Sequence, residues 1–165
     1  MNLDKFTQKA QEAIISAQSL AEERNHSQIE PEHLLLALMR QSDGIAPQIV
    51  GKIGSDPAAL AAAVERELET KPRVTGATSR VRLSLALDKV LKQAKKTARG
   101  MRDEYVSTEH LLLALAGGRS PLHNFLGGYG VTRDAILQTL AQVRGSQRIT
   151  SISRSPREVN FTCAA

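Results

Sequence analysis

Two glutamate–histidine pairs are the residues of this sequence most able to do chemistry. Glu32-His33 and Glu109-His110 each precede a run of leucines, and seven consecutive residues are identical in the two places at an offset of 77. A carboxylate can pair with an arginine guanidinium, and an imidazole can exchange protons or bind a metal. Such pairs can form a binding site, or they can simply begin two helices.

Histidine spacing and cysteine content argue against metal and nucleophilic chemistry. His33 and His110 are too far apart for a zinc motif, and the lone Cys163 lies near the C-terminus. No Ser/His/Asp or Cys/His arrangement has local support, and no phosphate-loop motif occurs in the sequence. We therefore expect no catalytic residue, no metal and no cofactor in this chain. His33 and His110 are interpreted as core or helix-cap residues, and His26 and His123 as loop or surface residues.

A helix start accounts for the position of both glutamates. Pro31 suits the first turn of a helix, because its φ is fixed and its missing N–H is not needed there. Ser107 or Thr108 can cap the equivalent helix in the second half through a side-chain oxygen. Glu32 and Glu109 then lie at the positive end of a helix dipole, which stabilises a carboxylate by about 0.3–1 kcal/mol.

The duplication extends beyond the leucine runs. Apolar residues at helical spacing predict a long helix that begins near Phe6, and the same pattern recurs at the same offset from Leu83. In each half a buried helix, a short amphipathic helix and a fourth helix follow; Asp56-Pro57 begins the fourth helix of the first half and Thr132 that of the second. Because period-two runs of β-branched residues are missing, a sheet is not expected.

These patterns predict an all-α fold of eight helices in two pseudo-twofold-related four-helix repeats. One double-repeat domain should cover residues 1–145. Repeat one takes about residues 1–70, a linker 71–81, and repeat two about 82–145. The polar, aperiodic residues 146–165 predict a flexible tail.

Composition predicts closely packed helices rather than a secreted or membrane protein. Hydrophobic residues make up 41% of the 165 residues and aromatic residues only 3%, while alanine and leucine, which favour helices, are abundant. The N-terminus lacks the regions of a secretory signal, and no apolar stretch has membrane-spanning length. We therefore expect a cytoplasmic protein without a membrane partner.

Charge is unevenly distributed along the chain. Residues 1–70 carry 6 basic and 11 acidic side chains, a net −5, whereas residues 71–105 carry 10 basic and 3 acidic, a net +7. A basic segment can be a solvated linker and helix face, or it can bind nucleic acid. The solvated interpretation is favoured because the segment lacks aromatic residues before Tyr105 at its edge. The nucleic-acid alternative would use Lys89, Lys92, Lys95, Lys96 and Arg99.

Four segments of the sequence match those of one known domain family. They are Phe6-Thr7-x-Lys9-Ala10, Glu30 to Leu38, Tyr105 to Leu115 and Val143 to Arg148. They resemble the Clp amino-terminal repeat domain, and the resemblance covers about residues 1–150. Within that family the second-repeat segment and the Arg-Gly-Ser-Gln-Arg ending resemble the ClpB branch, the protein disaggregases, more than the ClpA and ClpC branches. Residues 151–165 depart from the family pattern.

The resemblance implies a mobile, non-catalytic module of a hexameric AAA+ ring that threads aggregated polypeptide. ATP would be used only by the ATPase modules, which are absent from this chain, and the isolated domain is expected to be a monomer. Unfolded or aggregated polypeptides would be its partners. Thr7, Asp103 and Glu109 match polar positions associated in the ClpB branch with substrate handling.

Binding of unfolded chains needs exposed apolar surface, and the natural place is a groove where the first helices of the two repeats meet. Candidates for this groove are Ala13, Ile14, Ala17, Val90, Leu91, Ala94 and Leu111. As an alternative, Glu32 and Glu109 resemble sites of the ClpC branch that grip phosphoarginine-marked substrates, and a ClpA-like adaptor-binding role is the related interpretation. Arginine–carboxylate pairing makes the phosphoarginine alternative chemically sensible.

Overall fold

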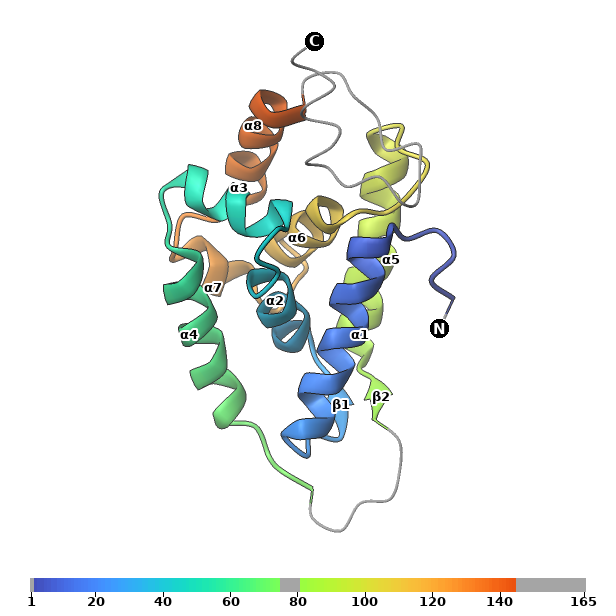
Figure 1. Ribbon diagram of the computed structural model, residues 1–165, viewed down its shortest axis with the longest axis vertical. Coiled ribbons are helices and arrows are strands. Elements are labelled where there is room, and N and C mark those ends of the chain that lie inside the picture. Colours follow the sequence, from blue (N-terminus) through green and yellow to red (C-terminus); the bar gives the residue numbers. More distant parts are fainter. Residues whose placement is uncertain (1, 75–80, 145–165) are drawn as a thin grey trace.

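A computed structural model describes residues 2–74 and 81–144, and its elements follow the same order in both halves of the chain (Figure 1). The first half comprises α1 (Gln8–Glu23), β1 (Gln28–Ile29), α2 (Pro31–Met39), α3 (Ile45–Ile53) and α4 (Pro57–Glu69). The second half comprises β2 (Arg82–Leu83), α5 (Leu85–Gly100), α6 (Thr108–Ala116), α7 (His123–Gly127) and α8 (Arg133–Arg144). Eight helices in the described ranges confirm the predicted all-α class, whereas the tail predicted for residues 146–165 lies outside them.

Short parallel pairings join the two halves. β1 pairs in parallel with β2, with Ile29 opposite Leu83, and Phe6 forms an isolated parallel bridge with Val106. Phe6 and Leu83 are equivalent positions of the two repeats, as are Ile29 and Val106, so each pairing is the counterpart of the other. The sequence predicted no sheet, and this was wrong for four residues: β1 and β2 form a two-stranded parallel sheet with two residues in each strand. The two-residue ladder forms where the segment before a first helix crosses the segment before the other half's buried helix.

Hydroxyl caps fix the helix starts beside these crossings. The Thr7 hydroxyl accepts a hydrogen bond from the Ala10 N–H at 3.3 Å, and the Ser84 hydroxyl accepts one from the Leu87 N–H at 3.0 Å. The Thr7 N–H also donates to the Val106 carbonyl at 2.9 Å. Because each cap satisfies an amide that the helix leaves unpaired, the same local device starts α1 and α5.

α2 and α6 form the centre of the molecule. Every residue of α6 is buried, and so is every residue of α2 except Glu32. α2 packs against α1, α4 and α6, while α6 also contacts α1, α3, α5, α7 and α8 (Figure 1). This confirms the expectation of buried central helices, and each fully buried leucine contributes about 1.5–3 kcal/mol. Among the described helices, none combines the length and the hydropathy that crossing a bilayer requires.

Candidate functional site

The seven apolar candidates for an inter-repeat groove lie inside the core. None is more than 6% exposed, and all belong to one continuous hydrophobic cluster. The expected open seam is therefore filled by the protein's own side chains, because the apolar faces of the helices pack directly against one another. A role in binding polypeptide remains a prediction that requires the packed helices to separate. The residues concerned are Ala13, Ile14, Ala17, Val90, Leu91, Ala94 and Leu111.

Two large apolar side chains that sequence periodicity did not single out are exposed. Ile15 on α1 is 55% exposed and Leu85 at the start of α5 is 70% exposed. Neither residue lies on the apolar face of its helix. An apolar residue outside the helical period of 3.6 was therefore the sequence signal that could have identified them.

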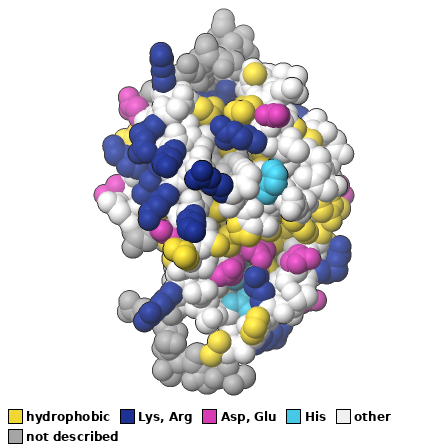
Figure 2. Space-filling model, turned by 180° about the vertical axis from the view of Figure 1, so that it is seen from behind, with side chains coloured by type: hydrophobic (Ala, Val, Ile, Leu, Met, Phe, Trp, Pro, Cys, Tyr) yellow, Lys and Arg dark blue, Asp and Glu magenta, His cyan; other side chains and the backbone are white. Residues whose placement is uncertain are grey.

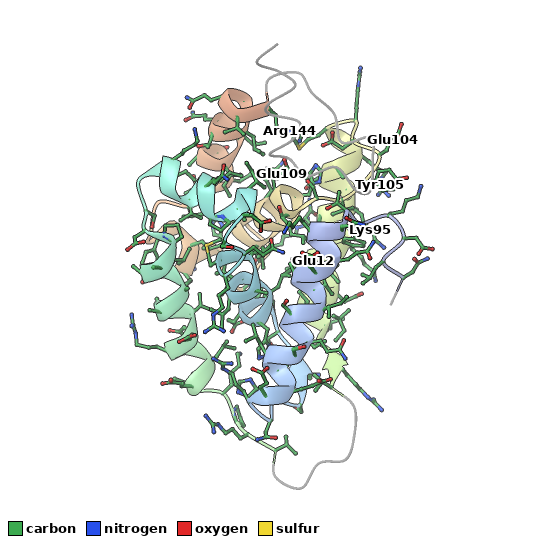
Figure 3. All side chains as sticks on the ribbon, in the orientation of Figure 1. Glu12, Lys95, Glu104, Tyr105, Glu109 and Arg144 are labelled. Atoms are coloured by element: carbon green, nitrogen blue, oxygen red, sulfur yellow. The ribbon has the colours of Figure 1, made fainter. Side chains whose placement is uncertain are left out.

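A buried polar cluster lies at the start of α6. The Asp103 carboxylate contacts His110 Nε2 at 2.7 Å through one oxygen and accepts from Arg144 Nη2 at 2.6 Å through the other. Arg144 Nη1 lies 3.7 Å from Glu109 Oε2, and the Ser107 hydroxyl donates to the other Glu109 oxygen. Glu109 and His110 are fully buried and Arg144 is 3% exposed. Figure 3 shows Glu109 and Arg144 close together between α6 and α8.

Hydrogen bonding determines the tautomer of His110. The Ser107 N–H donates to His110 Nδ1 at 2.8 Å, so the ring hydrogen is on Nε2 and points to Asp103. Of the two predicted candidates, Ser107 is the cap of α6 and Thr108 is its first residue, and His110 completes a capping box. The core-or-cap interpretation of His110 is confirmed, while Asp103 is an internal ion-pair partner that is 6% exposed.

Burial raises the pKa of the Glu109 carboxyl, because the charged form loses its hydration. Electrostatic interaction with His110 and Arg144 acts in the opposite direction. Chemically, the carboxylates of Asp103 and Glu109 form a site for a guanidinium, and Arg144 of the same chain occupies it. Sequence reasoning missed Arg144 because its partner Asp103 lies 41 residues away and no motif links the two.

The equivalent site of the first repeat has a different composition. The Glu30 N–H donates to His33 Nδ1 at 2.8 Å, and His33 Nε2 lies 2.8 Å from His26 Nδ1. Burial lowers the pKa of His33 to about 4, and burial also lowers the pKa of His26. Glu32 forms an ion pair with Lys71 at 2.9 Å.

His26 corrects a prediction made from the sequence. It was expected at the surface, but it is 5% exposed because its ring packs against that of His33 at a centroid separation of 5.0 Å. His123 is exposed, as expected, and its Nδ1 lies 2.9 Å from the Ala116 carbonyl oxygen.

The structure brings Thr7 near the second polar cluster and leaves Glu32 in the other repeat. Thr7 is 1% exposed and is hydrogen-bonded to Val106, which lies in the segment between Asp103 and Glu109. Its cap role is confirmed by geometry, whereas a substrate contact remains a prediction.

Four of the five basic residues proposed for nucleic acid share one face of α5, because Lys92, Lys95, Lys96 and Arg99 are spaced i, i+3, i+4 and i+7. Lys95 lies over the Phe6 ring at 5.7 Å, while Lys89, Lys92 and Lys96 line a pocket. Nucleic-acid binding by this face remains a prediction. Over residues 2–74 and 81–144 the structure holds no group of three or more His, Cys, Asp or Glu side chains that could bind a metal ion.

Comparison with known proteins agrees with this geometry. The model of the Clp repeat (R) N-terminal domain matches residues 5–129. The chaperone protein ClpB of Bacillus cereus is 40% identical over 154 residues, which are 92% of this chain and 18% of the relative. ClpB of Mycobacterium tuberculosis is 38% identical over 151 residues, again 18% of its length. The chain therefore spans less than a fifth of the curated relatives that it matches.

Solved structures show the same architecture. The N-terminal domain of Hsp104 from Candida albicans superposes with a TM-score of 0.79 at 28% identity, covering 90% of this chain and 97% of that one. A complex of the ClpV N-domain with a VipB peptide has a TM-score of 0.69 at 17% identity, covering 86% and 90%. At that identity the second likeness concerns the fold alone.

Proposed function

Because the chain belongs to the Clp repeat (R) N-terminal domain family, we propose that it is the polypeptide-binding module of a ClpB-type disaggregase. The observation that carries the proposal is the 40% identity to a ClpB chaperone over 92% of the chain. The module would bind unfolded or aggregated polypeptide without catalysis. ATP binding, assembly into a hexameric ring and a cytoplasmic location are proposed for the full-length protein.

We place the binding surface at the seam between the first helices of the two repeats. In the closed arrangement its apolar residues are buried, so polypeptide would enter as α1 moves away from α6. Affinity should be modest, about micromolar or weaker, because part of the binding energy is spent on separating packed helices.

Chemical-shift mapping with a permanently unfolded polypeptide tests this proposal. Methyl signals of Ile14, Leu91 and Leu111 should shift in a saturable manner. The surface-exposed Val74, which is 38% exposed and lies in the linker, provides a control methyl that should not move. If signals move only outside the seam, the surface is wrong; if no signal moves at high polypeptide concentration, polypeptide binding itself is contradicted.

The phosphoarginine alternative has weaker support. Arg144 already lies against Glu109 and Lys71 against Glu32, so a substrate guanidinium would have to displace an internal cation at either carboxylate. Capture of phosphoarginine that disappears in Glu109→Ala would favour this alternative over the ClpB-type assignment.

A further inference from the structure

A pocket of about 760 Å³ lies between α5, the segment of residues 117–120 that follows α6, and the first residue of α8. Five of its twelve lining residues are lysine or arginine, and none is aspartate or glutamate. Figure 2 shows dark blue side chains gathered on this face of the molecule. The five, called the basic rim below, are Lys89, Lys92, Lys96, Arg119 and Arg133.

The basic rim is poorly neutralised. Lys92 forms an ion pair with Asp88 at 2.9 Å, and it is the one member of the rim that pairs with a carboxylate among the described residues. A concave surface lined by charges of one sign concentrates its field and attracts counter-ions. The pocket is therefore electrostatically suited to an anionic ligand.

The basic rim belongs to the second repeat only, because the equivalent positions of the first repeat are not basic. The first four members have counterparts in repeat one at the offset of the duplication, and Arg133 corresponds to Pro57 because each is the first residue of the last helix in its repeat. None of these counterparts is basic. They are Glu12, Ile15, Ser19, Ser42 and Pro57.

The pocket floor is apolar. Val90, Leu113 and Ala114 line it and are at most 3% exposed, so little of their side chains is accessible. The methylene chains of the rim lysines can add apolar contact surface above them. Nucleic acid that lacks a duplex gains much of its affinity by stacking bases on aromatic rings, and no aromatic side chain lines this pocket. An extended polypeptide can place apolar side chains beside the methylene chains of the rim lysines and its carboxylates at their charged ends.

We propose that this pocket binds an acidic segment of a partner polypeptide that alternates carboxylate and apolar side chains. The basic rim would supply charge-assisted hydrogen bonds to the carboxylates. Val90 is the one seam candidate that also lines the pocket, so variants of the basic rim test the pocket separately from the function proposed for the seam.

The test uses the whole chain and a fluorescein-labelled peptide of alternating glutamate and leucine, with fluorescence anisotropy as the measurement. Binding should weaken as salt increases, because exposed charge pairs are screened. A peptide in which glutamine replaces every glutamate should bind at least about tenfold more weakly.

Matched charge reversals locate the site. Lys89→Glu combined with Lys96→Glu should weaken binding by about tenfold or more. Lys52→Glu combined with Arg66→Glu changes the net charge equally at exposed positions of the first repeat and should have little effect. Circular dichroism on both variants verifies that they fold.

Several outcomes overturn the proposal. Equal loss in both double variants would indicate general charge attraction, and equal binding of the glutamine peptide would exclude carboxylate recognition. A single-stranded oligonucleotide that binds through the rim when the acidic peptide does not would assign the pocket to nucleic acid. Concentration-dependent self-association that is abolished only by the rim variant would assign it to a second copy of this chain.

Discussion

The beginnings of α2 and α6 share one backbone frame and differ in what it holds. In both, the N–H of the cap residue donates to Nδ1 of a histidine three residues later at 2.8 Å, from Glu30 to His33 and from Ser107 to His110. In both, the histidine Nε2 then meets a side chain seven residues before it. The frame fixes which ring nitrogen carries the hydrogen, and the two sites differ in the partner side chain that Nε2 meets.

That partner is His26 in the first repeat and Asp103 in the second, at equivalent positions of the duplication. Burial lowers the pKa of His33, and the neighbouring His26 and Lys71 lower it further. In the second repeat the Asp103 carboxylate instead accepts from His110 Nε2 and anchors Arg144. The residue seven positions before the histidine therefore decides whether the site holds a second imidazole or a buried guanidinium.

Removing Arg144 should have the largest effect on this comparison. Arg144→Met removes the guanidinium that lies between the buried carboxylates of Asp103 and Glu109, and we expect a loss of about 3–5 kcal/mol in the free energy of unfolding. Urea denaturation followed by circular dichroism measures it.

Two further variants sharpen that result. Glu32→Gln breaks the partly exposed pair with Lys71, whose side chains are 15% and 27% exposed, and should cost about 1 kcal/mol or less. Adding Glu109→Gln to Arg144→Met should restore part of the stability by removing a buried carboxylate. Equal losses for Arg144→Met and Glu32→Gln would refute the contrast between the repeats.

Acidification should destabilise the protein through His33 of the first repeat. The folded pKa of His33 is about 4, below the ordinary value of 6.5, so the unfolded chain binds more protons between those values. Stability therefore rises with pH across this window and is lost as pH falls through it, by roughly 2–3 kcal/mol for this group.

Replacing the partner tests the cause. His26→Asp gives His33 the carboxylate that His110 has, and it should raise the pKa of His33 and flatten the loss of stability between about pH 6.5 and 4. NMR titration of the histidine rings gives the pKa values, and urea denaturation at each pH gives the stability. An unchanged pH profile in His26→Asp would show that burial alone, without the second imidazole, sets the behaviour of His33.

The smallest expected effect concerns the caps, where the repeats should behave alike. Thr7→Ala and Ser84→Ala each remove a side-chain acceptor from the first turn of α1 or α5, and each should cost about 1 kcal/mol. Thermal and urea unfolding of both variants provide the measurement. A much larger cost at Thr7 would mean that its hydroxyl does more than cap the helix.

Much of the fold could be read from local pattern. The period of the apolar residues located α1 and α5, and Asp56, Thr132 and Ser107 marked helix starts that the structure contains. The burial of α2 and α6 was predicted from their leucine runs, because consecutive apolar residues cover every face of a helix. The candidate site was less accessible, because burial of the seam residues depends on how closely the helices pack.

By itself, the sequence determined the elements, their duplication and the caps, because helix period and capping act over a few residues. Tertiary structure decided the rest. It buried His26 against His33, filled the expected seam with its own side chains and brought Arg144 to Asp103 across 41 residues. These outcomes depend on which faces meet when the two repeats pack, and a guanidinium finds its carboxylate only after the chain between them has folded.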